Sequence, residues 1–450
     1  MANEWRNVYF VGIGGIGMSA LARYFNTRGV KVSGYDRTPT ALTALLQAEG
    51  IEVRFTEDVD SLPEGIDLVV RTPAIADSHL ELVYFREQGF PILKRAQVLG
   101  ALTQGRPTLA VAGTHGKTTV SSMIAHLLHA SPVGCTAFLG GIATNYQTNF
   151  IGGESENAVV EADEYDRSFL HLHPDIAVIT AVDPDHMEIY GDLAAIEDAF
   201  LEFSSQIKPG GALVLRHGLP IEARVSPDRL YTYGTNEAGA DFQARNLQFG
   251  GRVCGFDLIS PVENISGLRL KVPGYHNVEN ATAAIAVAQL MGAGADDIRK
   301  ALSSYEGVAR RFEYVIDTPE LVFIDDYAHH PKEVEAVLTS VRDLYPDRRI
   351  TAVFQPHLFT RTRDFADEFA ASLSLADEVM LLDIYPAREE PIEGVTSTML
   401  IERMRDCKRD LVSKDELTRR LLDRRPQVLL TIGAGDIGAL IGPLARRLGQ

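Results

Sequence analysis

The chain has 450 residues, a length typical of about three domains, and 45% of these residues are hydrophobic. Its 43 basic and 61 acidic side chains give a net charge of −18, which argues against a general binder of nucleic acids or anionic membranes. No apolar run approaches the roughly 18 residues that span a bilayer, and no basic segment followed by an apolar one opens the chain, so we expect a cytoplasmic protein. Cys135, Cys254 and Cys407 have no paired spacing and predict neither disulfide bonds nor a zinc site.

The first predicted segment is a βαβ unit with a glycine-rich turn. A strand at 8–11 leads into the sequence GIGGIG at 12–17, then a helix and a second strand at 30–35 that ends on Asp36. The glycines match a dinucleotide fingerprint, in which a later acidic residue holds a ribose hydroxyl. The same pattern recurs at 433–438, where we favour close strand–helix packing, so the pattern alone does not identify a dinucleotide. We infer only that the first turn can hold a diphosphate at a helix N-terminus.

The remaining predicted elements continue the alternation of strands and helices. Strands are predicted at 67–71, 91–94, 108–112, 157–161, 176–181, 321–325, 349–354 and 427–432, and helices at 78–88, 274–291 and 331–343. A linker is expected at 103–107, and 230–272 contains several short strand-like runs. We predict an α/β protein of three consecutive domains: a Rossmann-like domain at 1–103, a central P-loop ATPase-like domain at 104–312 and a Rossmann-like domain at 313–450.

A nucleotide phosphate site is predicted at 111–119, where the sequence VAGTHGKTT connects a strand to an amphipathic helix. A glycine-rich turn before a helix directs backbone N–H groups and the helix dipole at an anion. Lys117 adds a cation, and Thr118 adds a hydroxyl for Mg²⁺. The first glycine of the usual motif would fall on Val111, and this chain has a shorter form that begins at Gly113. The predicted phosphate-binding residues are Gly113, Thr114, His115, Gly116, Lys117, Thr118 and Thr119.

Acidic and imidazole side chains follow two predicted strands of the central segment. Glu161 opens the sequence EADE at 161–164, and His186 closes the sequence DPDH at 183–186. Because the carboxyl ends of parallel strands and the phosphate loop share one edge of a sheet, Glu161 and His186 are expected to converge on Mg²⁺ with Thr118. The alternative is that these side chains lie in solvated loops.

The third segment has its own candidate residues after two predicted strands. Tyr327 and His329 follow the first of these strands, and the sequence QPHLFTRTR at 355–363 follows the next. Arg361 suits a carboxylate because a guanidinium group bonds both oxygens, so we predict that it holds an amino-acid carboxylate beside Tyr327 and His329. Histidines before a helix more often cap or pack, and the roles of His330, His357 and Arg363 stay open.

Taken together, the motifs resemble the Mur ligase family. They occur in its order: GTHGKTT at 113–119, the acidic stretch at 161–164, Asp185-His186, GYHNVEN at 274–280, RRFE at 310–313 and DYAHHP at 326–331. The sequence GIGGIGM at 12–18 and the segment 355–363 are similar to the alanine-adding branch of this family. The resemblance extends from residue 8 to about residue 440.

The resemblance implies an ATP- and Mg²⁺-dependent amide-forming ligase of peptidoglycan precursor synthesis. ATP would phosphorylate the lactyl carboxylate of UDP-N-acetylmuramate, and L-alanine would attack the acyl phosphate while Lys117 and Mg²⁺ stabilise the anions. His329 is a candidate to accept the proton of the amine, although proximity to the carboxylate site explains it equally well. The implied partners are these small molecules, without nucleic acid or membrane, in a monomer or homodimer.

The resemblance also implies residues for each ligand. Catalysis would use Lys117, Glu161, His186, His329 and Arg361. One Mg²⁺ would be held by Thr118 and Glu161, and a second by His186. The UDP-sugar would contact Gly14, Gly15, Ile16, Gly17, Met18, Asp36, Thr72 and Ala74. Adenosine would contact His276, Asn277, Asn280, Arg311 and Asp326, and L-alanine would contact Tyr327, His329 and Arg361.

Three departures from the family pattern and three alternative functions accompany this interpretation. Leu358 replaces an arginine of many relatives, no lysine lies between residues 186 and 208 to become a carbamylated second-metal residue, and the loop RTPAI at 71–75 is not serine-rich. The alternatives are a ligase that recycles a murein tripeptide, a nicotinamide-dependent oxidoreductase and a regulatory nucleotide-binding protein.

Overall fold

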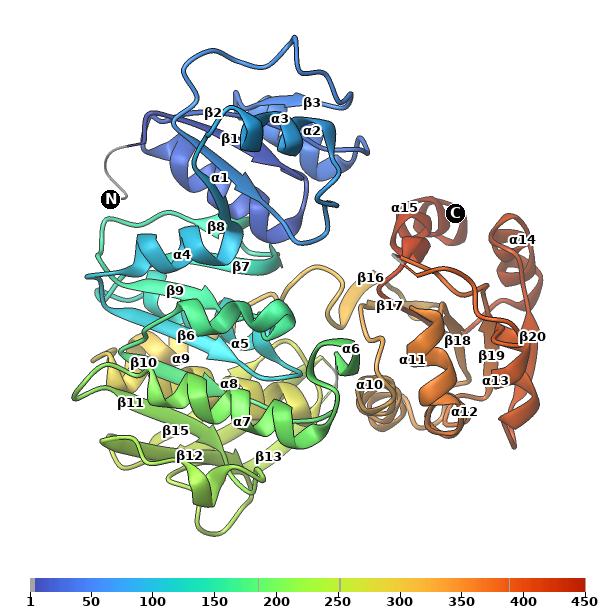
Figure 1. Cartoon of the computed structure of the whole chain (residues 1–450). Helices are drawn as coiled ribbons and strands as arrows, with labels where there is room; N and C mark the ends of the chain where they lie inside the picture. Colours follow the sequence, from blue (N-terminus) through green and yellow to red (C-terminus); the bar gives the residue numbers. More distant parts are fainter. Residues whose placement is uncertain (1–4, 185, 251, 388, 450) are drawn as a thin grey trace. The chain divides into compact units, whose positions relative to one another are not determined.

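The computed structural model describes residues 5–184, 186–250, 252–387 and 389–449 (Figure 1). The chain divides into two compact units. The first comprises Met1–Asn246, Phe256–Leu268 and Glu279–Tyr305, and the second comprises Leu247–Gly255, Arg269–Val278 and Glu306–Gln450. The first predicted domain and most of the second therefore lie in one unit, and the boundaries predicted from the sequence stay predictions. None of the helices in the described ranges is both long and apolar enough to cross a membrane.

The N-terminal sheet is a parallel sheet with the strand order β3-β2-β1-β4-β5. Its elements are β1 (Asn7–Val11), α1 (Ile16–Thr27), β2 (Lys31–Tyr35), α2 (Ala41–Ala48), β3 (Glu52–Arg54), β4 (Leu68–Arg71), α3 (Leu80–Glu87), β5 (Ile92–Lys94) and α4 (Arg95–Thr103). Every residue of β1 is buried, as a central strand covered on both faces requires. The strand order reverses beside β1, which places the glycine-rich turn where ligands bind in open α/β sheets.

The central sheet has the strand order β15-β14-β13-β12-β11-β10-β6-β9-β7-β8. Its strands are β6 (Thr108–Ala112), β7 (Thr136–Ala143), β8 (Thr148–Ile151), β9 (Ala158–Glu161), β10 (Ile176–Ile179), β11 (Ala212–Arg216), β12 (Arg229–Thr235), β13 (Phe242–Gly250), β14 (Val253–Ile259) and β15 (Ile265–Leu270). The helices are α5 (Lys117–His129), α6 (Met187–Tyr190), α7 (Leu193–Ser205), α8 (Tyr275–Leu290) and α9 (Ala295–Ser304). Because β6 lies between β10 and β9, the three segments that follow these strands meet at one edge of the sheet.

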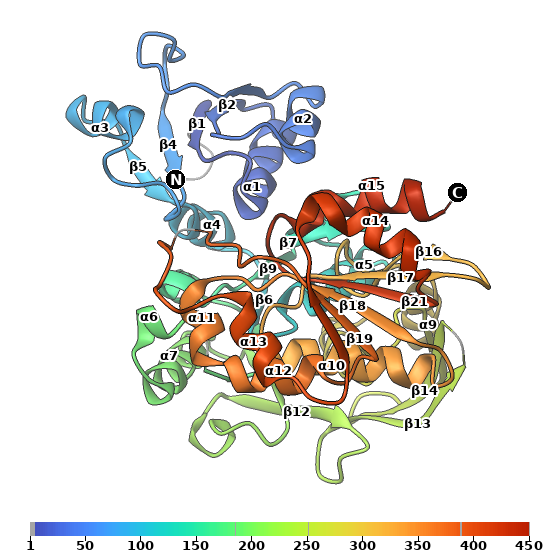
Figure 2. The ribbon, with the colours of Figure 1, turned by 90° about the vertical axis from the view of Figure 1, so that its right-hand side faces the viewer.

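The C-terminal sheet has the strand order β16-β17-β21-β18-β19-β20, and β16 pairs antiparallel to β17. Its strands are β16 (Glu313–Asp317), β17 (Val322–Asp326), β18 (Ile350–Phe354), β19 (Glu378–Leu381), β20 (Lys408–Leu411) and β21 (Val428–Ile432). The helices are α10 (Pro331–Leu344), α11 (Phe359–Asp364), α12 (Ala366–Leu373), α13 (Ser397–Arg403), α14 (Lys414–Arg424) and α15 (Ile441–Leu448). Figure 2 shows α10, α12 and α13 on one face of this sheet and α14 and α15 on the other. The predicted α/β class with Rossmann-like terminal domains is confirmed.

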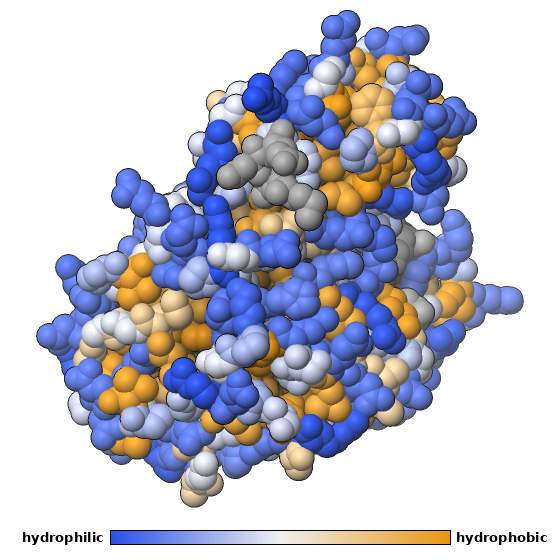
Figure 3. Space-filling model, turned by 60° about the vertical axis from the view of Figure 1, so that its left-hand side comes forward, coloured by the Kyte–Doolittle hydropathy of each residue, from blue (hydrophilic) through white to orange (hydrophobic). Residues whose placement is uncertain are grey.

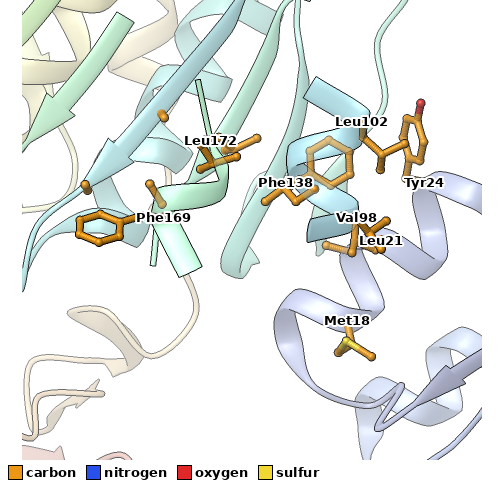
Figure 4. Close-up of a cluster of buried hydrophobic side chains, with 14 of the residues drawn as sticks. Met18, Leu21, Tyr24, Val98, Leu102, Phe138, Phe169 and Leu172 are labelled. Atoms are coloured by element: carbon orange, nitrogen blue, oxygen red, sulfur yellow. The ribbon is translucent and has the colours of Figure 1, made fainter. Parts of the chain in front are cut away.

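An apolar cluster joins α1 and α4 to the central sheet within the first unit (Figure 4). Leu21 and Tyr24 of α1 are buried, and Phe138 of β7 belongs to the same cluster. The first unit therefore buries the contact between its N-terminal and central sheets.

On the face drawn in Figure 3, hydrophilic residues predominate and apolar residues form separate patches, in keeping with the net charge of −18.

Candidate nucleotide and substrate sites

The predicted phosphate loop connects β6 to the first residue of α5. Gly113 and Gly116 have φ angles of +136° and +81°, which residues with a side chain rarely adopt. A Cβ atom at Gly113 would also lie 2.8 Å from the backbone nitrogen of Ala181. The loop is tied to the segment after β10, since the Thr114 N–H donates to the Ala181 carbonyl at 3.0 Å. The backbone thus forms a glycine turn that leads into a helix N-terminus, and its binding of a phosphate stays a prediction.

Lys117 is held at the start of α5 by two acceptors. Its ammonium group donates to the Gly113 carbonyl at 2.7 Å and lies 2.8 Å from Oε2 of Glu164. Burial by itself would lower the pKa of Lys117, but the carboxylates of Glu164, Asp163 and Glu161 outweigh it and raise the pKa above its usual value. Glu164, whose side chain is 2% exposed, was not singled out by the sequence analysis. Its only sequence signal is its place in the acidic stretch at 161–164.

Glu161 lies next to the loop threonine that was predicted to hold Mg²⁺. The Thr118 hydroxyl donates to Oε1 of Glu161 at 3.1 Å, and the Gly140 N–H of β7 donates to Oε2 at 3.0 Å. A Cβ atom at Gly140 would lie 2.5 Å from the Glu161 carboxyl carbon, so only glycine leaves room for this carboxylate. A hydroxyl beside a carboxylate is a donor set that suits Mg²⁺, which takes its other ligands from phosphates and water.

His186 lies on the same edge of the central sheet but contacts a different carboxylate. Its Nε2 is 3.9 Å from Oε1 of Glu164. Across the described residues, no group of three or more His, Cys, Asp or Glu side chains is arranged to hold a metal ion. Asp185, the neighbour quoted with His186, lies outside the described residues. The joint metal site of Thr118, Glu161 and His186 stays a prediction.

The N-terminal glycine turn is closed by contacts that its glycines permit. Asp36 accepts a hydrogen bond from the Gly14 N–H at 2.8 Å, and a Cβ atom at Gly12 would lie 2.7 Å from the Thr72 methyl group. Gly15 is the N-cap of α1, and Ile16 and Met18 occupy its first turn. The predicted ribose contact of Asp36 is untested, and its observed role is to hold the turn. Ala74 follows Thr72 in the loop after β4, and its predicted uridine contact is likewise untested.

Arg95 is a candidate functional residue that the sequence analysis missed. A Cβ atom at Gly17 would lie 2.9 Å from the Arg95 Cδ, so the side chain crosses directly over the first turn of α1. Nη2 of its guanidinium group lies 3.2 Å from Oδ2 of Asp163. It therefore lies between the glycine turn and the acidic stretch of the central sheet.

A cavity of about 90 Å³ connects these two regions within the first unit. Its lining residues come from α1, α4, β7 and the end of β9: Ile16, Gly17, Arg95, Gly140, Glu161 and Asp163 are among them. A molecule whose diphosphate lay at the start of α1 could thus extend toward Glu161, past the guanidinium group of Arg95. This cavity is the feature that relates the two predicted sites to each other.

The residues predicted to contact adenosine fall in both units. Asn280 belongs to the first unit, where its Oδ1 lies 2.9 Å from the position of a Cβ atom at Gly116. His276, Asn277, Arg311 and Asp326 belong to the second unit. Burial lowers the pKa of His276 to about 4 and raises the pKa of Asp326 to about 6. Asp326 accepts hydrogen bonds from the Phe312 and Ala328 N–H groups, each at 2.7 Å, and so shapes the segment that carries Arg311.

The carboxyl edge of the C-terminal sheet carries a row of rings. Tyr327 lies edge-on to His329, His329 edge-on to His357, and His357 is stacked on Tyr385, with centroid distances between 5.6 and 5.9 Å. Arg311 lies over the Tyr327 ring at 5.2 Å. The structure therefore brings Tyr327 and His329 together with His357 and Tyr385, and the predicted contact of Tyr327 and His329 with an amino acid beside Arg361 stays a prediction.

Arg361 lies on α11 and is 7% exposed. The preceding Leu358 is buried with a φ angle of +71°, and its N–H donates to the Tyr385 carbonyl at 3.0 Å. Glu389 accepts a hydrogen bond from the Thr360 N–H at 3.0 Å, which fixes the first turn of α11. The carboxylate-binding role of Arg361 stays a prediction.

The second glycine pattern, at 433–438, is occupied by protein side chains. A Cβ atom at Gly435 would lie 2.8 Å from the Tyr385 Cβ, and one at Gly438 would lie 2.6 Å from Nη1 of Arg310. Gln355 accepts a hydrogen bond from the Ile437 N–H at 2.9 Å. These glycines serve close packing, as the sequence analysis favoured.

Comparison with known families covers almost the whole chain. Residues 7–106 match the "Mur ligase family, catalytic domain", residues 111–288 match the "Mur ligase middle domain" and residues 310–435 match the "Mur ligase, glutamate ligase domain". The three matches follow the order of the three sheets.

Individual relatives give the same result. A Phocaeicola vulgatus protein named UDP-N-acetylmuramate–L-alanine ligase is 50% identical, with 97% of this chain and 96% of the relative covered. A Flavobacterium psychrophilum protein of the same name is 48% identical over 100% of this chain and 99% of the relative. The crystal structure of UDP-N-acetylmuramate-alanine ligase MurC from Thermotoga maritima is 30% identical, with a TM-score of 0.83 and 98% of both chains covered. A murein peptide ligase from Psychrobacter arcticus, at 23% identity and a TM-score of 0.74, shares the fold.

Proposed function

The chain belongs to the Mur ligase family, and we propose that it joins L-alanine to UDP-N-acetylmuramate at the expense of ATP. The products are UDP-N-acetylmuramoyl-L-alanine, ADP and phosphate, in peptidoglycan precursor synthesis. The observation that carries this proposal is the cavity that runs from the first turn of α1 to Glu161. The cavity supports the proposal because a UDP-sugar bound at α1 would then lie on one path with a phosphate bound beside Glu161, as amide synthesis through phosphoryl transfer requires.

Each end of this path has a defined task. The start of α1 offers backbone N–H groups to the diphosphate of the UDP-sugar. Arg95 is positioned to attract the negatively charged UDP-N-acetylmuramate, since its guanidinium group borders the cavity between Gly17 and Asp163. The γ-phosphoryl group of ATP, held near Lys117, passes to the lactyl carboxylate and leaves an acyl phosphate and ADP.

Thr118 and Glu161 are the residues that would hold Mg²⁺, since their side chains already touch at 3.1 Å. When bound, this ion supplies positive charge that neutralises the phosphate oxygens. Lys117 contributes a second positive charge, which its acidic neighbours keep protonated. His186 is proposed as a ligand of a second ion.

The second half-reaction uses the amine of L-alanine. The neutral amine attacks the acyl carbon, the tetrahedral adduct expels phosphate, and an amide remains. The Nδ1 of His329 lies 3.0 Å from the Tyr327 carbonyl oxygen, an acceptor, so the ring proton belongs on Nδ1 and Nε2 is the basic nitrogen. His329 is thus suited to take the proton of the amine, while Arg361 holds the carboxylate of L-alanine.

The two alternatives outside the ligase class leave these features unexplained. A nicotinamide oxidoreductase has no use for Lys117 or for the contact between Thr118 and Glu161. A regulatory nucleotide-binding protein has no use for the row of rings in the C-terminal domain. We also propose that the protein acts in the cytoplasm on small molecules, as a monomer or homodimer.

Isotope transfer tests the proposed chemistry. With UDP-N-acetylmuramate that carries ¹⁸O in its carboxylate, L-alanine and MgATP, one labelled oxygen should appear in the released phosphate. The reason is that phosphate leaves the acyl carbon with the bridging oxygen, which came from the carboxylate. Product amide without label in the phosphate would contradict the acyl-phosphate route. Label transfer with murein tripeptide and not with L-alanine would assign the donor to the recycling ligase instead.

A further inference from the structure

A polar network is buried where α1 packs on β8. Asn149, the second residue of β8, is 0% exposed. Its side-chain amide donates to the carbonyl oxygen of Ile16, the first residue of α1, and to the Ser19 hydroxyl at 2.9 Å. Its Oδ1 accepts a hydrogen bond from Nη1 of Arg23, two turns further along the helix. One side chain of the central domain therefore contacts three residues of α1.

The charge in this network is neutralised on the helix side. Arg23 is 4% exposed, and its guanidinium group lies 2.7 Å from Oε1 and 2.8 Å from Oε2 of Glu49, which follows α2. The ion pair is complete inside the N-terminal domain. Because Nε and Nη2 donate to Glu49, the guanidinium group is held in one orientation, and Nη1 donates to Asn149.

The surrounding contacts are apolar and have little directional preference. Tyr24 of α1 lies against Phe138 and Phe150, with ring centroids 5.4 and 6.0 Å away. Such contacts hold α1 against the sheet, but the hydrophobic effect is non-directional and does not by itself specify one position of the helix along the sheet. Hydrogen bonds to a buried amide, in contrast, resist displacement of the helix, because a shifted helix would leave buried polar groups unpaired. The network with Asn149 therefore sets the position of α1 along the sheet.

This position matters because both partners of the contact reach the cavity. Ile16, whose carbonyl oxygen Asn149 holds, lines the cavity at the start of α1. On the other side, β8 pairs with β7 at Phe150 and Phe138, and Gly140 of β7 donates to Glu161. Asn149 is thus connected by two adjoining strands to the carboxylate that borders the other end of the cavity.

We propose that Asn149 is a positioning residue that sets the start of α1 at the working distance from the phosphate loop. This inference rests on the proposed function, because it assumes that a UDP-sugar bound at α1 is phosphorylated beside Glu161. A side chain that positions two sites relative to each other leaves the affinity of each site unchanged and affects the reaction between them. A displacement of about 1 Å between reacting groups costs about 100-fold in rate.

The test compares Asn149→Ala and Asn149→Asp with the wild type. Asn149→Asp keeps the acceptor for Arg23 and loses both N–H donors, so it isolates the contribution of the hydrogen bonds to Ile16 and Ser19. The control is Asn145→Ala, a residue of the same hairpin that donates to the Ser304 carbonyl at 2.8 Å, away from α1. The measurements are calorimetric Kd values for UDP alone and for MgADP alone, and kcat for L-alanine-dependent phosphate release.

Both Asn149 variants should keep the two Kd values within about twofold and lose about 10- to 100-fold in kcat, while the control stays near the wild type. Loss of UDP affinity in proportion to kcat, or wild-type kcat in both variants, would overturn the inference. Absence of L-alanine-dependent turnover in the wild type would instead refute the proposed function. The two failures are therefore distinguishable.

Discussion

The ammonium group of Lys117 lies 2.8 Å from the buried carboxylate of Glu164, and this ion pair lies where the phosphate loop enters α5. The hydroxyl of Tyr190 donates to the Glu164 carbonyl at 2.7 Å, so the backbone of the acidic partner is also held. A nucleotide phosphate that binds Lys117 must compete with this carboxylate. We therefore expect the pair to place a cost on ATP binding while it keeps the lysine charged and in place.

Removal of either charge should have opposite consequences. Lys117→Ala should reduce phosphate release about 100-fold or more, because it deletes the charge that stabilises the transferred phosphoryl group. Glu164→Gln removes the negative charge that competes with phosphate and keeps the size of the side chain, so it should retain turnover with a KM for ATP lowered about threefold. Steady-state kinetics with varied ATP measure both. A raised KM for ATP in Glu164→Gln would show that the carboxylate assists binding.

A single methyl group at Gly140 should disable the metal site. In Gly140→Ala the new Cβ would lie 2.5 Å from the Glu161 carboxyl carbon, so Glu161 must leave its place beside Thr118. We expect kcat to fall about 100-fold and the Mg²⁺ concentration for half-maximal rate to rise about 10-fold. Gly152→Ala is the matched control, since its Cβ would meet only the Phe150 ring at 3.5 Å. Equal activity of both variants would remove Glu161 from the site.

Mild acid should destabilise the protein through His276. Its pKa falls from 6.5 to about 4 on folding, chiefly through burial, so the unfolded chain binds more protons between these values and stability falls as the pH drops from 6.5 toward 4. The loss between pH 7 and pH 5 is about 2 kcal/mol by linkage. His276→Asn should lack this loss. Asp326 acts in the opposite direction, because burial raises its pKa to about 6.

Urea unfolding of the wild type and His276→Asn at pH 7 and pH 5 measures the effect. The difference between the two proteins at each pH removes the contribution of Asp326. The free energy of unfolding of the variant minus that of the wild type should be about 2 kcal/mol larger at pH 5 than at pH 7. A difference that does not change with pH would mean that His276 titrates alike in both states.

The two nearby arginines of α11 should differ in their effect on the amino-acid substrate. Arg361 is 7% exposed, whereas the Arg363 side chain is 50% exposed and is paired with Asp364. Arg361→Lys should raise the KM for L-alanine about 10-fold, because a lysine cannot bind both carboxylate oxygens, and should leave the KM for ATP unchanged. Arg363→Lys should behave as the wild type. Similar KM values for L-alanine in both variants would contradict the predicted carboxylate site.

The sequence alone predicted those helices and strands that are determined by the residues within them. The strand at 108–112 was predicted to the residue, because a buried five-residue apolar run ends in a glycine turn. The helix α4 was missed. Its Gly100 lowers helix propensity, yet a Cβ atom there would lie 2.5 Å from the His171 carbonyl oxygen. The packing of α4 requires a residue that its local preference disfavours, and a single sequence does not show that.

The candidate site also contains residues that the sequence could predict and residues that it could not. The phosphate loop was predictable because its residues are contiguous and their chemistry depends on backbone form. Arg95 and Asn149 were not, because each acts on α1 from a distant part of the chain. Their partners are fixed by packing and have no characteristic spacing. Motifs predicted the ligands, and the tertiary structure was needed to relate one predicted ligand site to the other.

The most direct test of the account is Mg²⁺-dependent phosphate release from ATP with UDP-N-acetylmuramate, compared without an amino acid, with L-alanine and with murein tripeptide. We predict release that depends on L-alanine and is lost in Lys117→Ala. Release stimulated only by the tripeptide would assign the chain to peptide recycling. No stimulation by either donor would contradict the ligase function while leaving the Mur ligase fold in place.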